Sequence, residues 1–134
     1  MSSATILKAF NDHFIEFVSD VQTVFPENVD LLAAKNAFVA IRKANPKIII
    51  KIFNAQVVMP YQKEIDAGNL DFFIVKDYAG DLVSADNSQQ IMDAIDGLRN
   101  PVKQMDEENQ AKVMKYLQNL KKLSMMYESM YESM

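Results

Sequence analysis

Cysteine is absent from this sequence of 134 residues, which has only one histidine and three glycines. Without cysteine the chain has no disulfide, no thiolate metal site and no cysteine nucleophile. A single histidine excludes a metal site with several histidine ligands. Three glycines are too few for the glycine-rich loops that cradle phosphates, and neither nucleotide-binding pattern occurs. The common enzyme signatures are therefore missing, and we expect no catalytic residue, cofactor or metal site.

Long hydrophobic runs are missing as well. The longest, residues 37–41, is far below the roughly 20 residues that a membrane span requires. The first ten residues lack the charged start and apolar middle of a secretory signal. A formal charge of −4 argues against a general nucleic-acid binder, because phosphate contacts need a surplus of Lys and Arg. We expect a soluble, intracellular protein that does not contact a membrane.

What the sequence does contain is apolar residues at helical spacing, interrupted by four prolines. This pattern predicts an all-α fold, a single compact bundle of five to six helices with a less regular segment around residues 69–87. The first helix should run from about residue 3 to 25, with Phe17 in the middle of its apolar face. The second should run to about residue 44, with Asn28 or Asp30 as its N-cap.

The segment 46–59 is apolar almost all round and is predicted to be a central helix, with Lys47, Lys51 and Asn54 as its narrow polar strip. A buried strand over 47–53 is the alternative, because this run contains four isoleucines. Pro60 is expected to kink this helix or to restart one, which Gly68 ends in a left-handed conformation.

Helical spacing returns at Ser88, with a break or kink expected at Asn100–Pro101 and a final helix capped by Asp106. The buried stripe of that helix is predicted to contain Val113, Tyr116, Leu117, Leu120, Leu123 and Tyr127. We assign residues 1–127 to one helical domain. Residues 128–134 form a short repetitive tail, since MYES occurs at 126–129 and again at 130–133.

Two groups of charged or titratable residues are candidates for a catalytic or metal-binding role. His13 lies beside the apolar face of the first helix without a nucleophile pattern, so we expect a half-buried structural role. Four aspartates of an acidic segment can supply the oxygen ligands that Mg²⁺ prefers, although their spacing matches no calcium-binding loop. They are Asp71, Asp77, Asp81 and Asp86. Such residues more commonly serve as caps and turn formers.

The last helix carries two candidate contact surfaces. Its basic residues are candidates for nucleic-acid contact, although a solvated outer face is the commoner meaning of this pattern. They are Lys112, Lys115, Lys121 and Lys122. Four of the nine methionines fall in the last ten residues. If the helix continues, its end presents an adaptable apolar strip to a protein partner. The strip consists of Met126, Tyr127, Met130 and Tyr131.

Three stretches carry a resemblance: VFPENVDLLAAKNAFVAIRKANPK at 24–47, FFIVKDYAGDL at 72–82, and NQAKVMKYLQNLKKLSMMY at 109–127. Over residues 5–127 the chain resembles an uncharacterised family of small proteins from large DNA viruses that infect algae and other protists. The resemblance implies a viral origin and a location in the host cytoplasm or the virus particle. It brings no catalytic motif.

Three functions follow from these observations. The first is a non-enzymatic helical protein–protein interaction protein, a virion or assembly component that contacts itself or other virion proteins. Uneven charge supports assembly, since residues 69–98 carry six Asp and one Lys whereas residues 99–127 carry six basic and three acidic groups. The second is an accessory protein that contacts viral nucleic acid through the basic final helix. The third is a small Mg²⁺-dependent enzyme that uses the acidic segment.

Overall fold

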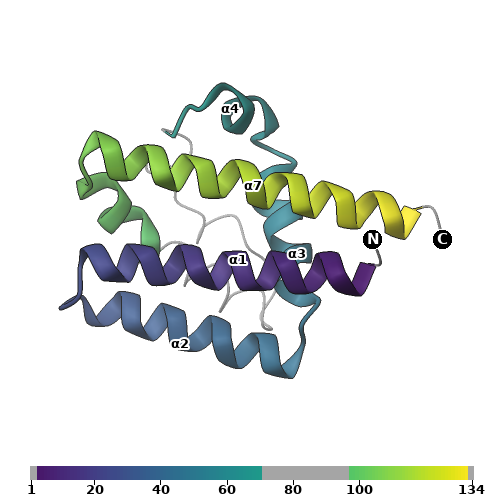
Figure 1. Cartoon of the computed structure of the whole chain (residues 1–134), viewed down its shortest axis with the longest axis horizontal. Coiled ribbons are helices and arrows are strands. Elements are labelled where there is room, and N and C mark those ends of the chain that lie inside the picture. Colours follow the sequence, from purple (N-terminus) through teal and green to yellow (C-terminus); the bar gives the residue numbers. More distant parts are fainter. Residues whose placement is uncertain (1–2, 71–96, 133–134) are drawn as a thin grey trace.

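Three long helices make up most of the described chain, which in this computed structural model comprises residues 3–70 and 97–132. α1 (Ser3–Val24) lies between α2 (Val29–Ala44) and α7 (Glu107–Glu132), and both neighbours run antiparallel to it (Figure 1). The ranges 3–70 and 97–132 are helical and contain no strand. The predicted all-α bundle is therefore confirmed. The less regular segment expected at 69–87 falls almost wholly outside the described residues.

α1 is amphipathic as its spacing predicts, and one face is fully buried. The buried apolar residues are Ile6, Leu7, Phe10, Phe14, Phe17, Val18 and Val21. The ring centroid of Phe14 lies 4.7 Å from that of Phe38 on α2 and 5.6 Å from that of Phe53 on α3. Both ring pairs pack edge to face. Phe17 lies 5.4 Å from the ring of Tyr116 on α7. Aromatic contacts thus connect α1 to α2, α3 and α7, and Phe17 is in the core as predicted.

α2 begins at the cap that the sequence predicts. The side-chain oxygen of Asn28 accepts hydrogen bonds from the backbone N–H groups of Asp30 (3.0 Å) and Leu31 (3.2 Å). These bonds satisfy two donors that a helix start leaves without partners. Asp30 in the first turn and Arg42 and Lys43 in the last turn complement the helix dipole.

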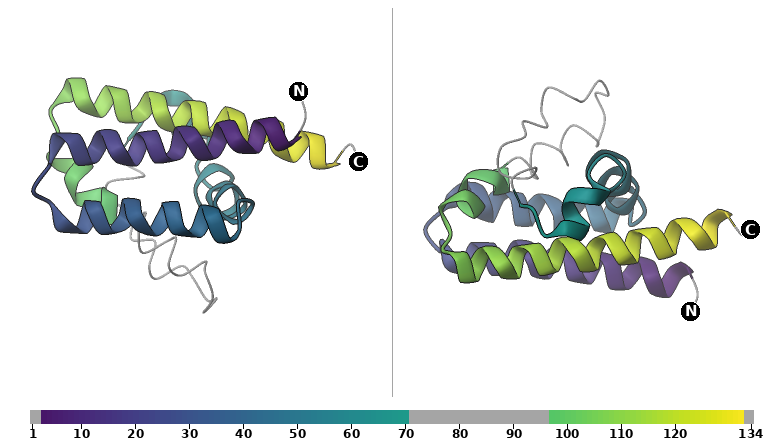
Figure 2. Two further views of the ribbon diagram at one scale, coloured as in Figure 1. Left: turned by 60° about the horizontal axis from the view of Figure 1, so that its bottom comes forward. Right: turned by 90° about the horizontal axis from the view of Figure 1, so that it is seen from above.

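The segment after Asn45 is helical rather than a strand, as predicted. α3 (Ile48–Phe53) continues into a π-helical turn, η1 (Asn54–Val58), which α4 (Gln62–Ala67) follows after a short turn. α3 and η1 lie against the α1–α2–α7 layer (Figure 2). Gly68 ends α4 with φ of 75°, the left-handed conformation that glycine adopts without a steric penalty. α3 begins two residues later than predicted, and the Asn45 side-chain oxygen accepts a hydrogen bond from the N–H of Lys47 before it (3.3 Å).

Of the three residues in the predicted polar strip, Lys47 and Lys51 are exposed, whereas Asn54 is buried. Its side chain is buried, and Ser124 of α7 donates a hydrogen bond from its hydroxyl to the Asn54 side-chain oxygen (3.0 Å). A π-helical turn begins at Asn54, and the polar partner on α7 is what allows this side chain to be buried.

The sequence predicts a break or kink at Asn100–Pro101, and the structure shows no break there, because residues 97–104 form one continuous helix. Leu98, Val102 and Met105 are buried, and this packing keeps the segment helical despite the proline. Of the stripe predicted for α7, four members are buried: Val113, Leu117, Leu120 and Tyr127. The other two, Tyr116 and Leu123, are partly buried against the core.

Replacing Phe14 should be among the most destabilising single changes in this chain. Phe14→Ala removes the ring that touches Phe38 and Phe53, and we expect a loss of about 3–5 kcal/mol in the free energy of unfolding. Urea unfolding followed by circular dichroism measures this loss. Val29→Ala, at an exposed position, is the control and should change stability by less than about 0.5 kcal/mol. A loss below about 1 kcal/mol for Phe14→Ala would contradict the packing described here.

A second prediction follows from the buried hydrogen bond between Ser124 and Asn54. Ser124→Ala leaves the Asn54 side-chain oxygen without its buried donor and should cost about 1–3 kcal/mol. The double variant Ser124→Ala with Asn54→Leu removes both polar groups and should recover most of that loss. The same unfolding measurement tests both variants, and equal losses for the single and double variants would rule out this reasoning.

Candidate functional site

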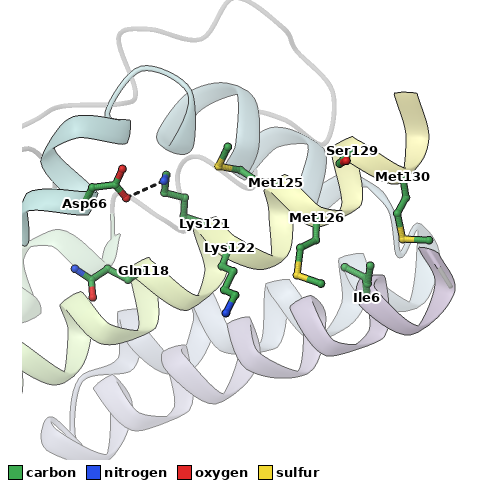
Figure 3. Close-up of a pocket in the computed structure, with 9 residues that line it drawn as sticks. All are labelled: Ile6, Asp66, Gln118, Lys121, Lys122, Met125, Met126, Ser129 and Met130. Atoms are coloured by element: carbon green, nitrogen blue, oxygen red, sulfur yellow. Dashed lines mark hydrogen bonds and ion pairs between the residues drawn. The ribbon is translucent and has the colours of Figure 1, made fainter. Parts of the chain in front are cut away.

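Methionines cover the outer side of the C-terminal half of α7. They border a shallow, open depression of about 690 Å³ between α1 and α4. Its lining residues are Ile6, Asp66, Gln118, Lys121, Lys122, Met125, Met126, Ser129 and Met130 (Figure 3). We call Met125, Met126 and Met130, of which the last two point toward the buried Ile6, the methionine surface.

Helical geometry explains why these methionines face outward. Leu117, Leu120 and Ser124 are buried on the inner side of α7, so Met125 falls on the outer side and Met126 at its edge. Met126 and Met130 are partly buried and point toward Ile6 of α1 (Figure 3), whereas Met125 is 42% exposed. The surface therefore combines methionines anchored against the core with one that is open to solvent.

Polar contacts hold α4 beside this surface. The Lys121 ammonium lies 2.7 Å from a carboxylate oxygen of Asp66, and the Gln118 side-chain amide donates a hydrogen bond to the carbonyl of Ile65 (3.0 Å). Lys122 is exposed and has no ion-pair partner within residues 3–70 and 97–132. Within the described residues, Lys122 is thus a positive charge beside the methionines that has no ionic partner.

The structure brings together only part of the strip that the sequence proposes. Met126 and Met130 share the surface, and their role in binding stays a prediction. Tyr127 does not belong to it, because its side chain is 2% exposed and lies in the core. Its position seven residues after Leu120 returns it to the inner side of the helix. The side chain of Tyr131 lies outside the described residues.

Sequence reasoning missed Met125 and the two residues contributed by other helices. Met125 could have been found, because it lies opposite the leucine stripe of the same helix. Ile6 and Asp66 carry no such signal, since they reach the surface only through the packing of α1 and α4 against α7.

The four lysines proposed for nucleic-acid contact border two different depressions, two lysines each. Lys112 and Lys115 are exposed but border a cleft that also contains Glu16 and Asp20 of α1. Lys121 is paired with Asp66, and Lys122 lies beside the methionines. Acidic groups therefore adjoin three of the four positions.

The cleft between α1 and α7, of about 350 Å³, contains a titratable cluster. The His13 ring lies 4.8 Å from that of Tyr116, and its Nδ1 lies 3.8 Å from a carboxylate oxygen of Glu16. The Tyr116 hydroxyl donates a hydrogen bond to Asp20. Burial raises the pKa of Tyr116, and the hydrogen bond to the Asp20 carboxylate raises it further. At neutral pH this hydroxyl is thus a donor that connects α7 to α1.

The His13 side chain is 23% exposed, which agrees with the half-buried position expected from the sequence. On the other side of α1, Asp12 contacts Lys8 (2.8 Å) and Arg42 of α2 (2.7 Å). The hydrogen bond from Lys8 lowers the pKa of Asp12, and that from Arg42 adds to the effect. The contact with Arg42 joins α1 to α2, whereas the contact with Lys8 lies within α1.

No group of three or more acidic or histidine side chains positioned to hold a metal ion occurs in the described ranges. The four aspartates proposed as Mg²⁺ ligands lie in 71–86, outside those ranges. The magnesium site stays a prediction from the sequence.

Comparisons of this chain with protein-family models, with curated protein sequences and with solved structures gave no match. Among the helices described here, none has both the length and the hydropathy of a membrane span.

The end of α7 should serve contact more than stability. Deleting Glu128–Met134 removes the outer methionine Met130 but leaves Tyr127 and the inner leucines, so we expect the melting temperature to fall by only a few degrees. Thermal unfolding of the full and shortened proteins at equal concentration measures the change. If the shortened protein is unfolded at 25 °C, the last turns of α7 are instead required for the core.

Proposed function

We propose that this protein is a non-enzymatic interaction protein that binds an apolar, acidic helix of a partner protein on the methionine surface. The observation that supports this most directly is the exposed side chain of Met125 beside Met126 and Met130, together with the charge of Lys122, which no carboxylate of residues 3–70 and 97–132 neutralises. Apolar area and one positive charge together favour a partner of this chemistry.

Methionine suits such a role because its unbranched thioether side chain adapts to different apolar shapes. A partner helix with apolar residues at positions i, i+3, i+4 and i+7 would lay one face on this surface. A carboxylate on the edge of that helix would pair with Lys122. Lys121 contributes less, since Asp66 already neutralises it.

Contact with nucleic acid through the final helix is less well supported. Glu16 and Asp20 adjoin Lys112 and Lys115, and the whole chain has a formal charge of −4. Phosphate binding needs several lysines or arginines that act together without nearby carboxylates.

A role in a virus particle or in its assembly rests only on the resemblance of residues 5–127 to the viral protein family. Mass spectrometry of purified particles of a virus that encodes the protein tests it. Detection at a level comparable to known structural proteins would support a virion component, and absence from clean particles would contradict it.

A pair of designed peptides tests the binding chemistry. Both are amphipathic helices with the same leucine stripe, one flanked by Glu and the other by Lys. With methyl-labelled methionine in the full-length protein, the Glu peptide should shift the NMR signals of Met125, Met126 and Met130. The signal of Met59, an exposed methionine outside this surface, should not move.

Charge reversal provides the matched comparison. Lys122→Glu should weaken binding of the Glu peptide on the order of tenfold and favour the Lys peptide. Lys103→Glu, which reverses an exposed lysine elsewhere, should leave binding unchanged. Equal binding of both peptides, or equal effects of both variants, would contradict the proposed function.

A further inference from the structure

Two methionines are exposed in the part of the chain that the structure describes. Met59 is 55% exposed, and Met125 of the methionine surface is 42% exposed. Met105 and Met114 are buried, at 9% and 8%. Peroxides convert the thioether of methionine to a sulfoxide, and accessible side chains react first. Exposure alone would therefore rank Met59 ahead of Met125.

The surroundings of the two exposed sulfur atoms reverse this order. The side-chain amide of Gln62 donates a hydrogen bond to the sulfur of Met59 (3.5 Å). This bond engages a lone pair, and a sulfur lone pair is what attacks a peroxide. The Met125 side chain points back along α7 toward Lys121, one helical turn earlier, as helical side chains do (Figure 3). Met125 thus has an ammonium group beside it instead of a donor on its sulfur.

The ammonium of Lys121 can assist a reaction at Met125. It lies 2.7 Å from a carboxylate oxygen of Asp66. An ammonium has three N–H donors, so it can donate to a second acceptor while it keeps Asp66. Attack on a peroxide places negative charge on the leaving oxygen, and a cation beside that oxygen stabilises it. Lys122 is not placed for this, because its side chain points away from Met125 (Figure 3).

We infer that Met125 is a site of reversible oxidation by hydrogen peroxide, and that its sulfoxide switches off binding at the methionine surface. A sulfur lone pair attacks one peroxide oxygen, an S–O bond forms and the O–O bond breaks. Sulfur loses two electrons, which the peroxide gains. The leaving oxygen departs as hydroxide and takes the proton of the transferred oxygen, so the products are the sulfoxide and water.

The switch rests on the function proposed above, whereas the oxidation site does not. The sulfoxide makes the open part of the methionine surface polar, and its oxygen can accept a hydrogen bond from Lys121. A partner helix then loses the apolar contact of Met125, and covering the new polar group adds a cost. The core is unaffected, because Met125 lies on the outer side of α7. Methionine sulfoxide reductases restore the thioether, so the change is reversible.

Peptide mass spectrometry of the full-length protein during treatment with dilute hydrogen peroxide measures the oxidation rate of each methionine. Met125 should react faster than Met59, although Met59 is the more exposed. Met114, on the same helix as Met125, should react at least about fivefold more slowly than Met125, in proportion to its exposure.

Matched substitutions test the part played by Lys121. Lys121→Gln should slow the oxidation of Met125 on the order of fivefold, the rate equivalent of one lost hydrogen bond. Lys122→Gln removes the neighbouring ammonium and should leave the rate unchanged. Asp66→Asn breaks the ion pair with α4 but keeps Lys121, so it should not slow the reaction. Equal slowing by Asp66→Asn and Lys121→Gln would overturn the assisting role of Lys121.

Binding of the Glu-flanked leucine peptide before and after brief oxidation tests the switch. Conversion of Met125 in the wild-type protein should weaken binding on the order of tenfold, and methionine sulfoxide reductases should restore it. Met125→Leu keeps an apolar side chain that peroxide does not oxidise, so its binding should not change on treatment. The control Met59→Leu should respond like the wild type.

A variant that imitates the sulfoxide separates polarity from other effects of peroxide. Met125→Gln should bind the peptide on the order of tenfold more weakly without any treatment. Its melting temperature should equal that of the wild type, because the side chain is exposed.

Two results would overturn the inference. If Met125 reacts no faster than Met59, the oxidation site is wrong. If the wild-type protein binds the peptide equally well before and after conversion of Met125, the switch is wrong. Failure of the proposed function looks different, since the untreated protein would then not bind the peptide at all. In that case the switch falls with it, and the oxidation rates alone decide the site.

Discussion

The packing of Phe14 is the interaction on which the rest of this structure depends. Its ring lies at the middle of the buried face of α1 and contacts Phe10, Phe17, Phe38 and Phe53 at centroid distances from 4.7 to 6.3 Å. Edge-to-face aromatic pairs add directional energy to the burial of apolar area. Because these rings come from α1, α2 and α3, their mutual fit determines how the three helices lie against one another.

A layer with α1 in the middle leaves the outer sides of α2 and α7 uncovered by the described helices. On α7 this side carries the methionine surface and Lys122, and on α2 it carries exposed valines and a leucine. The cleft between α1 and α7 is different, since His13 and Tyr116 there connect the two helices. Contacts that use the outer sides would not require the core to rearrange. This arrangement suits a protein that acts by binding.

Local signals in the sequence predicted most of the helices. Asn28 caps α2 and Gly68 ends α4 as expected, because these effects depend only on neighbouring backbone groups. Predictions failed where a distant segment intervened. Ser124 bonds Asn54 in the core, and Leu98, Val102 and Met105 pack so that the helix continues through Pro101. The pattern of apolar residues in a single sequence does not show which distant residues will contact each other.

The sequence alone determined that the described chain is helical, where its caps lie and which residues of each helix share a face. It also placed Met126 and Met130 on one side of α7. Only the tertiary structure decided which apolar faces are covered: Tyr127 is buried, whereas Val29 and Leu32 are exposed. The physical reason is that periodicity along a helix is a local property. The burial of a face depends instead on which remote helix packs against it, and that follows from the fit of side chains such as Phe14 and Phe38.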